Sequence, residues 1–391
     1  MNIKWLFYGS ITYLLSQWLI ISLFTKIYDA NTLGEYFYSL AICAPVFLFL
    51  NFKLSNIIVT QKDSLNIKKT YFVYRLILSL LGVFISLVCF LFLEKISFLV
   101  FLSVLIFKLL EHFDDFDIGY LLKESNVKEI FYLRLRRSVI YFLLILICSA
   151  FLKLNLEKTL IYSTSIYAII WIFFNYRKYY LIVKMDFFND LEIIKNGFFL
   201  GTSSAIGSLS SNYTKIFIGG TLGKTALTIY ACLEYGAMVI SIFLNILSQY
   251  FLKKFSDNRE NKIKIIKDLF LSNIIIIIII IILSVGVYFY GEEVLHIFYN
   301  EMISKYYYCL YYLFIYMFFK SSSSLIGCAI NSLNFYKFQL PITVSTILLL
   351  LLILNLLTNI SIDNIFFTLI LVGMFEFILC LIFFIKKIKV I

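Results

Sequence analysis

A ten-residue segment beginning at Lys108 carries an unusual number of ionisable side chains within an apolar stretch of the chain. Its members are Lys108, Glu111, His112, Asp114, Asp115 and Asp117. On a helix, Lys108, Glu111 and Asp115 share one face, because they are spaced i, i+3 and i+7. A charge in hydrocarbon costs roughly 2.5–3.5 kcal/mol on insertion scales, so such residues mark substrate or ion sites. One interpretation is a polar cavity in which Lys108 attracts an anion and Glu111 or Asp115 couples an ion gradient. The other is an internally paired charge cluster.

Four further lysines lie inside or beside apolar stretches: Lys26, Lys53, Lys215 and Lys320. Lys215 follows a stretch of regularly spaced Gly and Ser, and Lys320 precedes the run Ser321–Ser324. Lysines among small polar residues predict an electropositive chamber, and ammonium groups bind phosphate as point charges. We therefore predict that these four lysines and Lys108 bind a substrate diphosphate. For Lys26 and Lys215, snorkelling to the outer headgroups is the alternative.

Motifs for other chemistries do not occur in the sequence. It has no phosphate-binding GxxxxGK[ST] loop, no Ser-His-Asp set and no Gly-rich dinucleotide turn. None of the seven cysteines forms a Cys-x-x-Cys pair, so neither a disulfide framework nor a metal site is predicted. We expect a protein that is not an enzyme and that needs no cofactor and no metal.

The composition is that of a polytopic membrane protein. Of 391 residues, 62% are hydrophobic and 15% are charged, whereas soluble domains have about 25% charged residues. Apolar stretches near 20 residues are long enough to cross a bilayer. The hydropathy pattern predicts an all-α chain with about twelve transmembrane helices: 5–24, 36–58, 71–93, 96–118, 138–152, 159–176, 196–218, 226–251, 269–290, 306–330, 338–358 and 364–385.

The distribution of basic residues predicts the topology. The net charge is +11, but most of the 34 Lys and Arg residues cluster between spans on one predicted side of the membrane. This asymmetry indicates orientation by the positive-inside rule and not nucleic-acid binding. We predict a multi-pass protein of a bacterial inner membrane with both termini in the cytoplasm.

A repeated motif predicts two halves. Thr25-Lys26-Ile27-Tyr28 and Thr32-Leu33-Gly34 recur 189 residues later as Thr214-Lys215-Ile216-Phe217 and Thr221-Leu222-Gly223. Such an offset relates the first two spans to the seventh and eighth, so the copies share orientation. Parallel repeats commonly enclose a transport site. We predict two parallel six-helix lobes, 1–190 and 191–391, around a central cavity.

Pro45 stands in the middle of the second predicted span. Proline removes a backbone hydrogen bond and kinks a helix, which makes Pro45 a candidate hinge for alternating access. Proline is also common in static membrane helices.

Three segments carry a family resemblance. The segment LGEYFYSLAICAPVFLFLNFKL, residues 33–54, resembles the Gly, aromatic, Ala-Pro and Phe-Leu-Phe pattern of the Wzx-type O-antigen flippases. These belong to the polysaccharide-transporter branch of the multidrug/oligosaccharidyl-lipid/polysaccharide exporter superfamily. Lys108-x-x-Glu111 with Asp114, Asp115 and Gly119 is similar to a second segment of that family, and Ser208-Leu209 with Asn212, Lys215, Leu222-Gly223 and Tyr235 is similar to a third. Where the family usually has Pro-Arg, this chain has Thr214-Lys215, so no arginine fork is expected there.

The resemblance implies a transporter that works by alternating access. Its substrate would be an undecaprenyl-diphosphate-linked O-antigen or polysaccharide repeat unit, moved from the inner to the outer leaflet during lipopolysaccharide or polysaccharide biosynthesis. Its partners would be this lipid-linked oligosaccharide, membrane lipids and other polysaccharide-assembly proteins.

Two alternatives from the residues stay open. A drug/cation antiporter of the same fold would need a deep carboxylate, and the first span has none between Trp5 and Phe24. A membrane enzyme of polysaccharide assembly would need a long outer loop with convergent polar residues, and the predicted outer loops are short.

Overall fold

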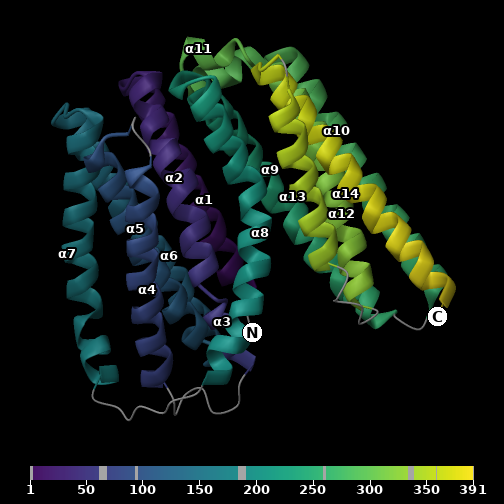
Figure 1. Ribbon diagram of the computed structural model, residues 1–391, viewed down its shortest axis with the longest axis horizontal. Helices are drawn as coiled ribbons and strands as arrows, with labels where there is room; N and C mark the ends of the chain where they lie inside the picture. The colour runs from purple at the N-terminus through teal and green to yellow at the C-terminus, as the bar shows by residue number, and fades with distance from the viewer. Residues whose placement is uncertain are drawn as a thin grey trace. The chain divides into compact units, whose positions relative to one another are not determined.

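The computed structural model describes residues 3–60, 68–92, 96–183, 191–258, 261–332, 339–357 and 359–390. In these ranges the chain is helical apart from short connections and contains no strand, which confirms the all-α prediction (Figure 1). The elements are α1 (Ile3–Ile27), α2 (Ala30–Leu50), α3 (Leu54–Thr60), α4 (Lys68–Leu91), α5 (Phe98–Lys123), α6 (Val127–Leu146), a π-helical turn η1 (Ile147–Phe151), α7 (Leu156–Val183), α8 (Leu191–Thr221), α9 (Lys224–Asp257), α10 (Lys262–Phe298), α11 (Glu301–Ser304), α12 (Cys309–Ser332), α13 (Gln339–Leu356) and α14 (Ile362–Val390).

Each predicted span overlaps one long helix of the described chain, but the second span also includes the short helix α3 and the fifth also includes η1. By length and composition, seven helices in the described ranges are apolar enough to cross a membrane: α1, α2, α4, α7, α10, α12 and α14. Helix α5 differs from these because it carries the charged segment that begins at Lys108.

The chain forms two compact units, Met1–Thr228 and Ile229–Ile391. Helix α8 belongs to the first unit, where it packs against α2. The predicted lobe boundary at residue 190 lies outside the described residues, so the division of the repeat into 1–190 and 191–391 stays a prediction.

Within the first unit, α1 packs against α6, while α5 contacts α2, α3 and α7. Gly119 allows the close approach of α5 to α3, because a Cβ there would lie 2.8 Å from the Cα of Ser55. Buried aromatic residues, among them Tyr71, Phe116 and Tyr120, fill the space between these helices and α4. The result is a rigid surrounding for the charged face of α5.

The second predicted span, 36–58, is wrong in its last third. Helix α2 runs without interruption through Pro45 but ends at Leu50. Phe52 and Lys53 then adopt positive φ angles of 49° and 45°, a conformation that non-glycine residues rarely adopt and that breaks the helix before α3. The hydropathy pattern missed this break because the apolar residues on both sides of it, up to Leu50 and from Ile57, outweigh its few polar residues in a window average.

The fifth predicted span, 138–152, begins too late. Helix α6 starts at Val127 and continues through η1 to Phe151. Its first half includes Arg134 and Arg137, which the sequence pattern placed in a loop. The reason is that hydropathy counts each arginine as a charge facing water, whereas Arg137 is buried against carboxylates.

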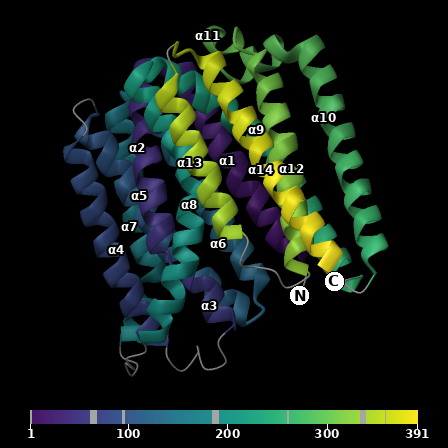
Figure 2. The same cartoon turned by 45° about the vertical axis from the view of Figure 1, so that its right-hand side comes forward.

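The second unit is held by α12, which packs against α10 and α14, and by α13 against α14 (Figure 2). Its core includes Phe251, Phe255, Leu325 and Phe384. The hydroxyl of Tyr299 donates a 3.0 Å hydrogen bond to the carbonyl of Cys232, which ties the end of α10 to α9.

Candidate functional site

The carboxylate of Glu111 on α5 is the centre of a buried charge cluster. Lys108 Nζ lies 2.7 Å from Glu111 Oε2, one helical turn away. Arg137 Nη2 of α6 lies 3.8 Å from Oε1, and the hydroxyl of Tyr13 on α1 donates to the same oxygen. Glu111 is therefore held by groups from three helices.

Asp114 lies one turn further along α5 and is held by two side chains from neighbouring helices. It accepts a 3.1 Å charged hydrogen bond from Arg137 Nη1 and a 2.8 Å bond from the indole N–H of Trp171 on α7. Its side chain is only 2% exposed. The guanidinium of Arg137 also lies 4.3 Å from the ring centroid of Tyr13. Arg137 therefore joins Glu111 and Asp114 into one network, which we call the Arg137 cluster (Tyr13, Lys108, Glu111, Asp114, Arg137 and Trp171).

A second network forms at the break between α2 and α3. The amide of Asn51 donates to Asp115 Oδ2 at 2.8 Å, and its carbonyl oxygen accepts from Arg75 Nη1 at 3.0 Å. Arg75 is fully buried in α4. Asn51 thus links the carboxylate of α5 to the guanidinium of α4 at the point where α2 ends.

The remaining ionisable groups of α5 are also engaged. Lys178 Nζ lies 2.5 Å from Asp117 Oδ1, and the Tyr179 hydroxyl donates to Asp117 Oδ2 at 3.1 Å. His112 Nδ1 lies 2.9 Å from the hydroxyl of Ser79. These contacts do not use every buried polar atom, because His112 Nε2 and the Nε and Nη2 atoms of Arg75 have no hydrogen-bond partner in the described part of the chain.

The predicted site residues do not all gather. Lys108 and Glu111 are together, whereas Asp115 belongs to the Asn51 network. Lys26 is exposed in the last turn of α1, Lys53 lies at the helix break, and Lys215 is buried in α8.

Lys320, in the second unit, pairs with Glu376 at 2.7 Å and keeps 46% of its side chain exposed. Pro45 is buried inside α2, and its role as a hinge stays a prediction.

Several side chains that contact or adjoin the charged residues of α5 were not expected from the sequence: Tyr13, Arg75, Arg134, Arg137 and Trp171. Arg134 lies one turn before Arg137 on α6, and its guanidinium donates to the hydroxyl of Ser10 on α1 at 2.6 Å. The i, i+3 spacing of Arg134 and Arg137 was the available signal, since it places both on one helix face. Three cations (Lys108, Arg134 and Arg137) therefore lie among the three carboxylates of Glu111, Asp114 and Asp115.

This arrangement is suited to binding an anion. Glu111 and Asp114 are already committed to fixed donors, whereas the side chain of Lys108 is 20% exposed and that of Arg137 only 8%. Lys108 is thus the cation that a ligand can reach. The described residues contain no group of three or more His, Cys, Asp or Glu that could hold a metal ion.

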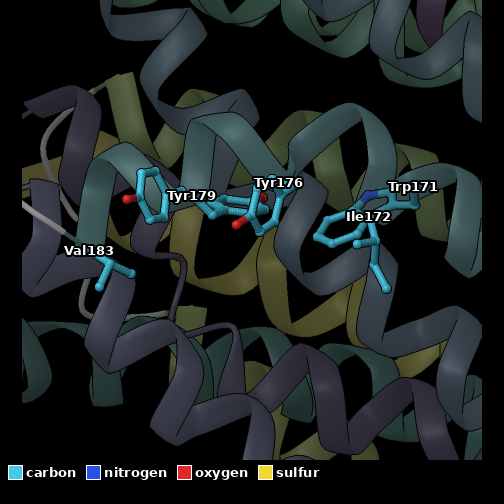
Figure 3. A pocket seen from close by; sticks show the side chains of 6 residues that line it. Trp171, Ile172, Tyr176, Tyr179 and Val183 are labelled. Atoms are coloured by element: carbon cyan, nitrogen blue, oxygen red, sulfur yellow. The ribbon is translucent and has the colours of Figure 1, made fainter.

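An apolar pocket of about 350 Å³ lies along α7 (Figure 3). Trp171, Tyr176 and Tyr179 contribute its aromatic walls, with Ile172 and Val183. The polar atoms of Trp171 and Tyr179 are used by Asp114 and Asp117. The pocket therefore presents hydrocarbon, as expected for a surface in contact with lipid chains.

A larger pocket of about 810 Å³ lies beside the junction of α8 and α9. Lys224 lines it and pairs with Glu35 of α2 at 2.6 Å. Glu35 also accepts the backbone N–H of Ser97 at 2.9 Å. One carboxylate thus joins the beginnings of α2, α5 and α9.

Comparison with known proteins gives a fold and a distant relative. No family model matches the chain. The capsular polysaccharide biosynthesis protein CapF of Staphylococcus aureus is 26% identical over 270 residues, which cover 68% of this chain and 67% of CapF.

The similar solved structures are transporters. An inward-facing multidrug resistance MATE family transporter of the MOP superfamily matches with a TM-score of 0.75 and 14% identity over 99% of this chain and 98% of its own. An outward-facing one gives 0.66 and 13% over 98% and 94%. A MOP superfamily transporter from Pyrococcus furiosus, described as having a binding pocket of reverse polarity that suggests a different function, gives 0.69 and 13% over 99% and 94%. This chain therefore has the two-lobed helical fold of the MATE-type transporters of the MOP superfamily.

Proposed function

We propose that this protein is a flippase for lipid-linked oligosaccharides. It would move undecaprenyl-diphosphate-linked repeat units from the inner to the outer leaflet of a bacterial inner membrane by alternating access. The transporter fold and the similarity to a capsular polysaccharide biosynthesis protein support this substrate class. The observation that carries the proposal is the partly exposed ammonium of Lys108 beside carboxylates that already have other donors.

The diphosphate is the group that such a cluster can recognise. Lys108 would contact it, because Lys108 is the most accessible cation of the cluster and ammonium binds phosphate as a point charge. Arg137 would act indirectly, by holding Glu111 and Asp114 in place. Lys26, Lys53, Lys215 and Lys320 remain candidates for further contacts along the path.

The second candidate is a drug or cation exporter, and the multidrug transporters among the similar structures favour it. A cationic substrate needs a carboxylate that is free to receive it. Glu111 and Asp114 are instead bonded to Arg137 and to further donors from neighbouring helices. Because both carboxylates already have bonding partners, neither is free to receive a cation, and an anionic substrate is favoured.

The test is complementation of a bacterial strain that lacks its own flippase, supplied with the genes for the native repeat unit. Surface polysaccharide is scored as a ladder on a gel. We expect the wild-type chain to restore the ladder and Lys108→Gln to reduce it at least tenfold at equal abundance. Glu111 keeps Tyr13 and Arg137 in this variant, so the fold should survive. Lys123→Gln, in the last turn of the same helix, is the matched control.

The possible results of this experiment distinguish an error in the proposed function from an error in the proposed role of Lys108. A ladder that Lys108→Gln leaves unchanged removes Lys108 from the site but keeps the function. No ladder with the wild-type chain, combined with export of a cationic dye from the same cells, supports the drug exporter instead.

A further inference from the structure

A pocket of about 590 Å³ lies between α5, α6 and α7, and no residue of the Arg137 cluster lines it. The residues that matter here are Glu129, Arg136, Val139 and Ile140 of α6, Asp117 of α5 and Lys178 of α7. The helices α5, α6 and α7 contact one another within the first unit. This pocket is therefore a feature of that unit alone.

The α6 wall of the pocket changes from charged to apolar along the helix. Glu129, Arg136 and Ile140 follow one another at spacings of seven and four residues, which keeps them on one face. Glu129 lies in the first turn, Arg136 about 10 Å further along the axis, and Ile140 beyond it.

The charges in this pocket differ in their availability. Lys178 and Asp117 neutralise each other across 2.5 Å. In the part of the chain that the structure describes, neither Arg136 nor Glu129 has an opposite charge within 4.0 Å. Arg136 instead lies over the ring of Phe174 of α7, 4.3 Å from its centroid. The pocket therefore presents one available carboxylate, then one available cation, then an apolar wall.

We propose that this pocket binds the headgroup of an amine-bearing phospholipid of the phosphatidylethanolamine type. The ammonium lies at Glu129, the phosphate at Arg136, and an acyl chain follows Val139 and Ile140. The order of groups along α6 is the order of groups in the lipid: amine, phosphate, hydrocarbon. Basic pockets between membrane helices bind lipid phosphates, and the additional carboxylate selects a headgroup that also carries a positive charge. In the predicted topology, α6 begins at the cytoplasmic face, so the lipid comes from the inner leaflet.

The test measures lipid binding to the full-length protein in detergent by native mass spectrometry. Phosphatidylethanolamine and phosphatidylglycerol of equal chain length are titrated separately and in competition. We expect the wild-type chain to bind phosphatidylethanolamine at least fivefold more tightly than phosphatidylglycerol. Arg136→Gln should lose this binding at least tenfold. Arg177→Gln, which removes an exposed cation of α7 outside the pocket, is the matched control and should bind as the wild type does.

A charge reversal at Glu129 tests the orientation of the lipid. Glu129 is exposed, so Glu129→Lys should fold normally. We expect this variant to prefer phosphatidylglycerol, because a second cation replaces the carboxylate that receives the amine. The proposal is overturned if the wild type binds both lipids equally, if Arg136→Gln loses no more than Arg177→Gln, or if Glu129→Lys keeps the wild-type preference.

Discussion

Arg137 is the residue on which the buried charges of the first unit depend. Its guanidinium contacts Glu111 and Asp114 and lies against the ring of Tyr13, with only 8% of the side chain exposed. A buried carboxylate that loses its counter-ion keeps the full cost of desolvation. The energetic role of Arg137 therefore exceeds that of Lys108, although Lys108 makes the shorter contact with Glu111.

We expect Arg137→Gln to lower the free energy of unfolding by about 3–5 kcal/mol, because it leaves two carboxylates without their shared cation. Thermal unfolding of the purified protein in one detergent measures the loss. Adding Asp114→Asn to this variant should recover part of the loss, since Asp114 is the carboxylate left without a counter-ion, whereas Glu111 keeps Lys108. A loss below 1 kcal/mol for Arg137→Gln would show that water reaches these carboxylates.

At the scale of helices, the close contact of α3 with α5 determines where the charged face of α5 lies. Asn51 ends α2 and binds Asp115, and α3 then packs against Gly119. The break between α2 and α3 thus positions one face of α5 twice, by a hydrogen bond and by steric fit.

Gly119→Val should separate α3 from α5, because its Cβ would lie 2.8 Å from the backbone of Ser55. We expect a loss of roughly 1–3 kcal/mol in unfolding free energy, with a lower yield of folded protein. Gly207→Val on α8 is the control, since a Cβ at Gly207 meets nothing within 4 Å. Equal yields and equal melting temperatures for the two variants would contradict this account of the contact.

The helices could be predicted from the sequence, but the partners of the charged residues could not. Twenty-residue apolar stretches predict helices because the signal is local, and each predicted span overlaps a long helix of the described chain, although the bounds of the second and fifth spans were wrong. The pairing of Lys108 with Glu111 followed from their spacing on one helix. The pairing of Arg137 with Asp114 did not, because it depends on how α5 packs against α6 and α7. The early start of α6 was missed for the same reason.

At the scale of the whole molecule, one ion pair joins two positions that the predicted repeat makes equivalent. Glu35 and Lys224 follow the two copies of the Thr-Leu-Gly motif and are separated by the same 189 residues. They contact each other at 2.6 Å, with both side chains less than one-fifth exposed.

Charge reversal tests this contact. Glu35→Lys and Lys224→Glu should each destabilise the protein, and the double variant should recover stability, with a coupling of about 0.5–3 kcal/mol. Melting temperatures of the four proteins give this coupling. Additive effects would show that the two side chains act independently. The reversed pair should recover less than the full stability, because Glu35 also accepts the backbone N–H of Ser97.

The opposite charges of Glu35 and Lys224 bear on which of the two predicted halves would assemble with which. If the predicted halves, 1–190 and 191–391, paired with copies of themselves through this contact, Glu35 would meet a second glutamate and Lys224 a second lysine. Each self-pairing brings like charges together, whereas the mixed pairing brings opposite charges together. If the two halves were expressed as separate polypeptides, this position would favour their assembly with each other over assembly with themselves.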